Sequence, residues 1–370
     1  MRVILSGGGT GGHIYPAVSI GKEIEKQYND AEILFIGTEK GLESNIVPEE
    51  GFNLMKIKVR GFERKLSFGN IVAVKESFTS LFRVSRIIKD FKPDIVIGTG
   101  GYVCGSVLLA AALMGVPTLI HEQNAFPGVT NKILARFVDV IAVNFPEAKK
   151  YFPENKKVIV TGNPIRSDML SISKEEGLKE FGFFKELPVV LVVGGSRGAK
   201  KLNESVLLLA KQCVSKKSFQ MLHMTGKTQY DDIIKLYSSE GIAMDTGYLK
   251  VMPYLHNMPY ALAACDIVIS RCGASTLSEI TALGKPSILV PYPYATDNHQ
   301  EYNGRALEKN GAAIVILERD LNADILYAEV ADFLNKKEKV NQMKLKSKEL
   351  GRSDAAYVIV KVADRLVKKQ

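Results

Sequence analysis

Short apolar runs alternate along the chain with longer stretches of helical period. The runs predict buried parallel strands, which lack polar residues on both faces. Stretches such as residues 16–28 and 78–91 predict amphipathic helices between them. This alternation is typical of a doubly wound α/β fold. In the first half, the predicted strands cover residues 3–5, 33–36, 95–97, 118–120, 140–143 and 158–160.

The pattern restarts after a turn at residues 161–164, Thr-Gly-Asn-Pro. Glycine and asparagine tolerate positive φ, and proline disfavours helix at the residue before it. The sequence therefore predicts two Rossmann-like halves joined near residues 161–166. The tail, residues 354–369, predicts an amphipathic helix with Val358, Val360, Val362 and Leu366 as its apolar residues. In the second half, the predicted strands cover residues 189–193, 221–224, 267–270, 287–290 and 313–316.

Composition limits the class of protein. With 46% hydrophobic and 24% charged residues among 370, the chain can bury a core in each half. The net charge of +9 suits an anionic membrane, a phosphorylated ligand or nucleic acid. No aromatic and basic platform for single strands is present, so we expect no nucleic acid partner. No apolar run approaches the roughly 18 residues that span a bilayer, so we expect a soluble or peripheral protein.

Four cysteines are scattered through the chain without metal-binding or redox spacing. Free thiols in a reducing compartment fit this pattern better than a disulfide framework or a zinc site. They are Cys104, Cys213, Cys265 and Cys272.

The first strand runs into a glycine-rich loop at residues 6–13. Gly7, Gly9 and Gly12 match the dinucleotide fingerprint, in which backbone N–H groups and a helix N-terminus bind phosphate. Glu39, near the end of the second strand, keeps a nicotinamide-dependent oxidoreductase open as an alternative. A third interpretation is tight packing of strand against helix.

His13 follows the last of these glycines. The positive end of a helix favours a neutral imidazole, which can remove a proton from an acceptor hydroxyl. We therefore name His13 as the candidate general base. The alternative is a capping or packing histidine.

Further loops of the same kind follow later strands. Glycines at residues 98–105 and 194–198 again lie between a strand and a helix, which predicts two phosphorylated ligands across a cleft. In residues 270–286, a helix opening at Ser275 suits a diphosphate, and Glu279 one turn further suits a ribose diol. Gln300 and His299 offer donors and acceptors for sugar hydroxyls. The alternatives are a solvated helix carboxylate and a solvated loop.

Several metal and nucleotide motifs are absent from the sequence. There is no Asp-x-Asp pair, no P-loop and no zinc spacing. We therefore expect neither metal nor cofactor, and expect helix N-termini with Arg166 or Arg197 to neutralise a diphosphate leaving group.

Taken together, these stretches resemble the MurG family of UDP-N-acetylglucosamine transferases, which convert lipid I to lipid II in peptidoglycan synthesis. The resemblance runs in the family's order over nearly the whole chain. It implies a GT-B fold, inversion at the anomeric carbon and a β-1,4 linkage to N-acetylmuramic acid. The matching stretches are GGGTGGHIYP, GTGGYVCG, HEQNAFPGVTNK, TGNPIR, GGSRGAKKLN, SRCGASTLSEITALGKP and ATDNHQEYNGRAL.

The resemblance also implies a division of labour. Residues 1–163 form the acceptor-binding and membrane-facing domain, with a helix at about 350–370 packing back on it. Residues 164–349 form the UDP-sugar-binding domain. The implied contacts to the nucleotide sugar are Thr10, Gly11, Gly12, Asn124, Arg166, Ser196, Leu255, Ala274, Ser275, Thr276, Leu277, Ser278, Glu279 and Gln300. In some family members a glutamine replaces His299, which weakens a role for that side chain.

Residues 56–92 are the candidate membrane contact, with ten lysines and arginines against three acids. Apolar anchors ringed by cations are what a peripheral contact needs, although a core helix with a basic face has the same pattern. We expect a location at the cytoplasmic face of the cell membrane. Another GT-B transferase or a UDP-sugar 2-epimerase stays open. The proposed anchors are Phe62, Leu66, Phe68, Ile71, Val72, Phe78, Leu81 and Phe82.

Overall fold

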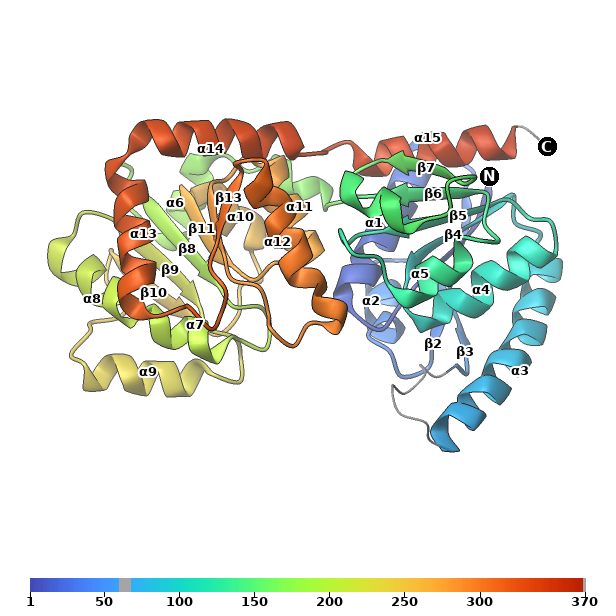
Figure 1. The fold of residues 1–370 in the computed structure, drawn as a ribbon, viewed down its shortest axis with the longest axis horizontal. Coiled ribbons are helices and arrows are strands. Elements are labelled where there is room, and N and C mark those ends of the chain that lie inside the picture. Colours follow the sequence, from blue (N-terminus) through green and yellow to red (C-terminus); the bar gives the residue numbers. More distant parts are fainter. Residues whose placement is uncertain (60–67, 369–370) are drawn as a thin grey trace. The chain divides into compact units, whose positions relative to one another are not determined.

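The computed structural model describes residues 1–59 and 68–368. For residues 68–75, 77, 78 and 167 it describes the backbone but not the side chain. The chain divides into two compact units (Figure 1). The first contains Met1–Arg166 and Arg352–Gln370, and the second contains Ser167–Gly351. Each unit is an α/β domain with one parallel sheet, as the alternation of strands and helices predicts.

The first sheet has the strand order β3-β2-β1-β4-β5-β6-β7. Its strands are β1 (Arg2–Gly7), β2 (Glu32–Thr38), β3 (Asn53–Ile57), β4 (Ile95–Gly100), β5 (Thr118–Glu122), β6 (Val140–Val143) and β7 (Lys157–Val160). Its helices are α1 (Gly11–Gln27), α2 (Glu43–Glu49), α3 (Phe68–Phe91), α4 (Tyr102–Leu113), α5 (Val129–Leu134), the 3-10 helix η1 (Pro146–Tyr151) and α15 (Ala355–Val367).

Alternating side chains of the central strands fill two hydrophobic layers. Val3 and Leu5 of β1 belong to a core cluster that includes residues of α1, α2 and α15. Ile4 belongs to the cluster on the other face, with residues of α3, α4 and α5. Because both faces are covered, the strand must be apolar throughout, which explains the continuous runs in the sequence.

Helix α15 returns from the end of the second unit to pack on α1. Its buried residues include Ile359, Val360 and Val362, and Tyr28 Oη donates a hydrogen bond of 2.8 Å to Asp364 Oδ1. The predicted apolar set was wrong at Val358, which is only half-buried, and missed Ile359. The helical period places positions 355, 359 and 363 on one face, whereas the prediction followed alternate residues.

The second sheet has the order β10-β9-β8-β11-β12-β13. Its strands are β8 (Val189–Val193), β9 (Gln220–Met224), β10 (Leu249–Met252), β11 (Ile267–Ser270), β12 (Ser287–Leu289) and β13 (Ala313–Val315). Its helices are α6 (Lys174–Phe181), α7 (Lys200–Ser205), α8 (Leu207–Lys216), α9 (Tyr230–Ser239), α10 (Met258–Ala264), α11 (Ala274–Ala282), α12 (His299–Lys309), α13 (Ala323–Asn335) and α14 (Lys337–Leu350), with the 3-10 helices η2 (Ser167–Leu170) and η3 (Thr296–Asn298).

Each predicted strand is present, but β3 and β10 were missed. Both are edge strands of their sheets. Edge strands are covered less completely, so β3 carries exposed residues such as Asn53 and Lys56 among its apolar ones. A search for continuous apolar runs passes over such a sequence.

The four cysteines are buried and unpaired. Burial raises the pKa of Cys104 to about 11 and that of Cys213 to about 12, so these thiols stay protonated near neutral pH. None of the helices in the described ranges combines the length and apolar character needed to cross a lipid bilayer.

Candidate functional site

The first candidate site lies at the carboxyl edge of the first sheet. The strand order reverses between β1 and β4, and ligands of doubly wound folds bind at such a reversal. The loop after β1 ends at Thr10, the N-cap residue of α1, and Gly11 and Gly12 are the first two residues of that helix. His13 lies in the first turn of α1, so it is not the cap that one alternative interpretation proposed.

Packing explains part of the glycine pattern. A Cβ on Gly7 would lie 2.1 Å from Thr99 Oγ1 and 2.7 Å from the carbonyl oxygen of His13. A Cβ on Gly101 would lie 2.3 Å from the carbonyl oxygen of Gly8. Gly12, by contrast, is exposed and has no atom closer than Thr10 Oγ1 at 3.7 Å. Gly9 is likewise exposed, with no atom closer than 3.7 Å to an added Cβ. The glycines of this segment therefore divide into Gly7 and Gly101, which allow close packing, and Gly9 and Gly12, which face outward.

The carboxylate of Glu43 accepts a hydrogen bond from a backbone N–H group of the loop after β1. Glu43 is fully buried, and its Oε2 accepts a hydrogen bond from Gly9 N at 3.1 Å. Its Oε1 accepts from Thr38 N at 3.0 Å and from Thr38 Oγ1 at 2.6 Å. Burial alone would raise the pKa of Glu43, but these hydrogen bonds outweigh it and lower the pKa. The Gly9 N–H is thus already used, which does not suit a dinucleotide pyrophosphate.

His13 is held by groups at the ends of β4 and β5. Its Nδ1 atom lies 3.0 Å from Gln123 Oε1 and 3.1 Å from the carbonyl oxygen of Thr99. Its Nε2 atom has no hydrogen-bond partner among the described residues. The ring is half-buried, so this nitrogen is the one that a substrate hydroxyl can reach.

Asn124 follows Gln123 in the loop after β5. Its backbone N and its Nδ2 donate to Glu122 Oε1 at 2.9 and 3.1 Å. The other carboxyl oxygen of Glu122 accepts from Gly128 N and Asn131 Nδ2. Glu122 therefore fixes the backbone of the loop that presents Asn124.

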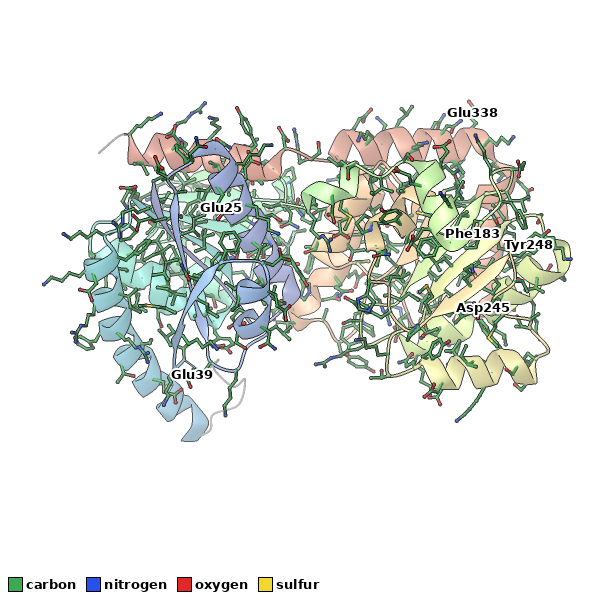
Figure 2. All side chains as sticks on the ribbon, turned by 180° about the vertical axis from the view of Figure 1, so that it is seen from behind. Glu25, Glu39, Phe183, Asp245, Tyr248 and Glu338 are labelled. Carbon is green, nitrogen blue, oxygen red and sulfur yellow. The ribbon has the colours of Figure 1, made fainter. Side chains whose placement is uncertain are left out.

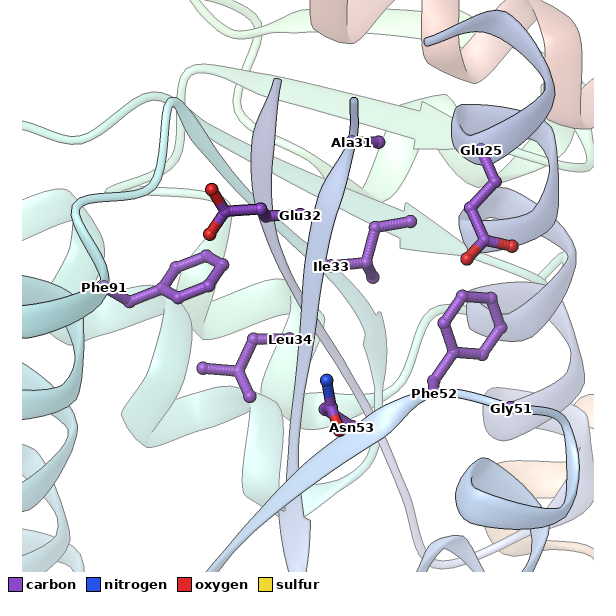
Figure 3. Close-up of a pocket in the computed structure, with 9 residues that line it drawn as sticks. All are labelled: Glu25, Ala31, Glu32, Ile33, Leu34, Gly51, Phe52, Asn53 and Phe91. Atoms are coloured by element: carbon purple, nitrogen blue, oxygen red, sulfur yellow. The ribbon is translucent and has the colours of Figure 1, made fainter. Parts of the chain in front are cut away.

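Two hollows border the first sheet. One of about 610 Å³ lies at its carboxyl edge and is lined by Tyr102 and by residues at the ends of β2 and β3, including Lys40 and Lys58. Glu39, the acid of the oxidoreductase alternative, also lines it and is exposed (Figure 2). The other, of about 290 Å³, lies at the amino ends of β2 and β3 beside Phe91 (Figure 3), away from His13.

The second candidate site lies where α11 begins, after β11. The strand order of the second sheet reverses between β8 and β11. Gly273 is the N-cap residue of α11 and no side chain caps this end. The Oγ atom of Ser275 is buried and has no hydrogen-bond partner within the described ranges. Unpaired N–H groups and an unused hydroxyl at one helix opening are suited to an anion.

The predicted residues of this segment share one short helix. Ala274, Leu277 and Ser278 are buried, whereas Ser275, Thr276 and Glu279 are half-buried. Ser278 Oγ donates to the carbonyl oxygen of Ala274 at 2.8 Å, so that hydroxyl is engaged by the helix itself. Ser275 and Glu279 lie one turn apart, so both side chains point to the same side of the helix.

Gln300, in the first turn of α12, accepts hydrogen bonds from the loops that follow β11 and β12. Its Oε1 accepts from Cys272 N at 3.1 Å and from Tyr292 N at 3.0 Å. Since the oxygen is engaged, its Nε2 is the group that can donate to a ligand. His299 Nδ1 lies 2.7 Å from the carbonyl oxygen of Thr296, a local turn contact.

The remaining predicted residues lie on other loops. Ser196 is exposed after β8, and its carbonyl oxygen accepts from Lys227 N at 3.3 Å. Lys227 Nζ lies 5.1 Å from the ring centre of Tyr254, next to the buried Leu255. Arg166 is exposed at the end of the first unit's main segment. The structure thus groups Ser196 with the loop of Leu255, and Ser275 and Glu279 with each other.

Sequence reasoning missed several residues that organise these sites. Gln123 and Glu43 contact functional loops through partners far along the chain, which no local spacing reveals. Arg271 pairs with Glu318 and donates to the carbonyl oxygens of Val290 and Pro291. Its position directly after a strand was the available signal. Over the described ranges, no group of three or more His, Cys, Asp or Glu side chains is placed to hold a metal ion.

Comparison with known proteins places the chain among glycosyltransferases. Residues 3–143 match the N-terminal domain of glycosyltransferase family 28, and residues 189–359 match its C-terminal domain. A UDP-N-acetylglucosamine–N-acetylmuramyl-(pentapeptide) pyrophosphoryl-undecaprenol N-acetylglucosamine transferase from Caldanaerobacter subterraneus is 53% identical over 97% of this chain and 98% of its own. The transferase of the same name from Acetivibrio thermocellus is 51% identical over 100% and 99%.

Solved structures agree on the fold. The crystal structure of Acinetobacter baumannii MurG superposes with a TM-score of 0.79 at 28% identity, over 98% of this chain and 99% of that one. A putative UDP-N-acetylglucosamine 2-epimerase from Listeria monocytogenes gives a TM-score of 0.73 at 14% identity, over 100% and 97%. At that identity the second similarity concerns the fold alone.

Proposed function

Because the chain belongs to glycosyltransferase family 28, we infer that it is a hexosyltransferase that uses UDP-N-acetylglucosamine. It transfers N-acetylglucosamine to an N-acetylmuramyl-pentapeptide linked through a pyrophosphate to undecaprenol, a step of peptidoglycan synthesis. This conclusion rests on the sequence identity to the two N-acetylglucosamine transferases above, which is 53% and 51% over nearly the whole chain. Proteins that share only a fold can have much lower identity, as the 2-epimerase at 14% does.

The donor is assigned to the second unit. The uncapped opening of α11 and the unused hydroxyl of Ser275 provide donors for the diphosphate. Glu279, one turn further, accepts hydrogen bonds from the ribose, and Gln300 Nε2 donates to a sugar hydroxyl. The uracil is assigned to the backbone at Leu255, in the loop after β10. Ser196 and Arg166 contribute to the nucleotide sugar from their loops.

The acceptor is assigned to the first unit. His13 Nε2 removes the proton from the 4-hydroxyl of the muramyl sugar, whose oxygen attacks the anomeric carbon of the donor. The bond from that carbon to the diphosphate oxygen breaks, and UDP leaves with the bonding electrons. A single displacement inverts the anomeric centre, which gives a β-1,4 linkage. Thr10, Gly11, Gly12 and Asn124 contact the transferred sugar.

The leaving diphosphate is stabilised by protein groups. Helix N-terminal N–H groups and the guanidinium of Arg166 or Arg197 neutralise its charge, so the reaction proceeds without metal or cofactor.

The lipid-linked acceptor requires the first unit to meet a membrane surface. Exposed apolar side chains lie on three helices that pack in succession, α3, α4 and α5. Phe82 is 78% exposed, Leu113 71% and Val129 60%. Arg83, Arg86 and Lys89 are exposed on the same α3, which favours anionic lipid. Of the predicted anchors, Phe62 and Leu66 lie outside the described residues, and no side chain is described for Phe68, Ile71, Val72 or Phe78.

We assign the protein to the cytoplasmic face of the cell membrane as a peripheral enzyme. Sedimentation with anionic and zwitterionic vesicles tests this assignment. Anionic vesicles should bind the protein preferentially, and changing Phe82 and Leu113 to serine should weaken binding at least about tenfold. Leu345→Ser, which removes a side chain 64% exposed in the second unit, is the control. Equal sedimentation with both vesicle types and no loss in the double variant would remove the membrane assignment.

Turnover of UDP-N-acetylglucosamine with and without the lipid-linked acceptor, in the presence of EDTA, tests the activity. We expect UDP release only with acceptor, together with a disaccharide product, and no loss on chelation. Conversion of UDP-N-acetylglucosamine to its 2-epimer without acceptor would instead favour the epimerase alternative, whose fold is similar.

A further inference from the structure

A buried chain of hydrogen bonds runs from His13 to the end of β7. Gln123 is 1% exposed and His121 is fully buried. Gln123 Oε1 lies 3.0 Å from His13 Nδ1, and Gln123 Nε2 lies 3.0 Å from His121 Nδ1. His121 Nε2 lies 2.9 Å from the carbonyl oxygen of Gly162. Two imidazoles are thus joined by one amide, within the first unit.

Backbone carbonyls decide which way the amide of Gln123 points. Its Nε2 lies 2.6 Å from the carbonyl oxygen of Thr99 and 3.2 Å from that of His121. A carbonyl oxygen can only accept, so the atom beside both must be the NH₂ group. The opposite orientation would place three oxygens together in a buried site. The amide oxygen therefore faces His13.

The protons of both imidazoles follow from this orientation. The Gly162 carbonyl accepts from His121 Nε2, so His121 Nδ1 is an acceptor for the Gln123 NH₂ group. Burial lowers the pKa of His121 to about 4, so this ring is neutral and carries one proton. At the other end, His13 Nδ1 faces two acceptors, Gln123 Oε1 and the Thr99 carbonyl, so it must donate.

We propose that Gln123 and His121 are positioning residues that hold His13 in the Nδ1–H tautomer and so present Nε2 as the basic nitrogen. The proposal rests on the role of His13 as general base. In water the Nε2–H tautomer of imidazole side chains predominates. In that tautomer the nitrogen that faces the substrate, Nε2, already carries a proton and cannot act as the base. The hydrogen-bonded chain reverses that preference before substrate binds.

The Gly162 carbonyl, at the end of this series of hydrogen bonds farthest from His13, is also held in place. Thr161 Oγ1 donates to the same Gly162 carbonyl oxygen at 2.9 Å. Gly162 has φ of +80°, and a Cβ there would lie 2.3 Å from Cβ of Arg352, where the chain re-enters the first unit. The Gly162 carbonyl, which sets the direction of these hydrogen bonds, therefore lies in a tight turn against Arg352 within the first unit.

The test reads the tautomer directly. Protein labelled with ¹⁵N at its five histidines is examined by two-bond ¹H–¹⁵N correlation in mildly alkaline buffer, where neutral imidazoles predominate. His13→Gln identifies the His13 signals by their loss. We expect the proton of His13 on Nδ1 in the unmodified protein, without substrate. A proton on Nε2 would overturn the proposal, even if no variant folds.

Gln123→Met removes the amide while keeping the length of the side chain. We expect the His13 signals to move toward the Nε2–H tautomer. We also expect kcat to fall, by at most the about 10²–10⁴-fold that a general base contributes, with little change in KM. Gln220→Met is the matched control, because Gln220 is equally buried but lies in the second unit. An unchanged Nδ1–H tautomer in folded Gln123→Met would overturn the proposal. Turnover by His13→Ala tests the proposed base separately and does not bear on the tautomer.

Discussion

The two glycine-rich openings of the molecule differ in what their polar groups already bind. In the first unit, the Gly9 N–H, the Thr99 carbonyl and His13 Nδ1 are all engaged by other parts of the same unit. In the second unit, the opening of α11 is uncapped and the Ser275 hydroxyl is buried without a partner in the described ranges. Neither helix opening is capped by a side chain, so the two openings differ in the polar groups beside them. Those of the first unit pair within that unit, whereas the Ser275 hydroxyl has no partner in the described ranges.

The difference shows that a glycine-rich turn between a strand and a helix can be suited either to holding a base or to binding an anion. Preorganised groups cost no rearrangement during reaction, which suits a base. Unsatisfied donors destabilise the free protein slightly but gain when an anion binds, which suits a diphosphate site. Variants at the opening of α1 should therefore change mainly turnover, whereas variants at the opening of α11 should change mainly UDP binding.

The largest effect is expected from His13→Ala. Loss of a general base should lower kcat about 10²–10⁴-fold. The KM for UDP-N-acetylglucosamine should change little, because the diphosphate, ribose and uracil are assigned to the second unit. Steady-state kinetics at saturating donor and acceptor measure this. Near-normal kcat would remove His13 from the mechanism.

Acidification should destabilise the first unit through His121. Burial lowers its pKa from 6.5 to about 4, so between these values the unfolded chain binds a proton that the folded unit does not. The free energy of unfolding should therefore fall by about 3 kcal/mol as the pH drops from about 6.5 to about 4. Hydrogen exchange of amides in β4 and β5 follows this unit separately.

His121→Phe should flatten that dependence, since it removes the titrating group. His223→Phe, which removes the equally buried histidine of the second unit, is the control and should leave the first unit's dependence unchanged. Parallel pH profiles for His121→Phe and the unmodified protein would contradict the assignment.

On the other side of the comparison, Ser275→Ala should weaken UDP binding without loss of stability. A hydrogen bond to a charged group contributes about 1.5–3 kcal/mol, so the dissociation constant should rise about tenfold or more. The hydroxyl has no partner in the described structure, so its removal should leave the melting temperature unchanged or slightly higher.

Calorimetric titration and thermal unfolding measure the two quantities for Ser275→Ala. Thr281→Ala is the matched control on the same helix, because its hydroxyl already donates to the Leu277 carbonyl at 2.9 Å. It should lower stability and leave UDP affinity unchanged. A loss of stability without a change in affinity at Ser275 would reverse the interpretation of α11.

The smallest effect concerns Gly12, an outward-facing glycine in the first turn of α1. Gly12→Ala should raise the free energy of unfolding by about 0.4–1 kcal/mol, because the site is helical and open, yet it should lower turnover. Gly7→Ala should lower stability instead, since its Cβ would overlap Thr99. Thermal unfolding compares the two, and unchanged turnover in Gly12→Ala would exclude a ligand contact there.

Much of the fold could be predicted because central parallel strands must be apolar on both faces. The edge strands β3 and β10 were missed since partial exposure breaks their apolar runs. The glycine loops and His13 could be placed from strand-to-helix spacing alone. The roles of Gln123, Glu43 and Gly162 could not, because their partners come from distant strands and depend on the three-dimensional packing.

The most direct test of the contrast is a crystal structure of the protein with UDP bound. We expect the diphosphate to contact the opening of α11 at Ser275, with the ribose at Glu279, while Glu43 keeps its hydrogen bond to Gly9. A diphosphate bound instead in the loop after β1, with Glu43 displaced, would contradict this expectation.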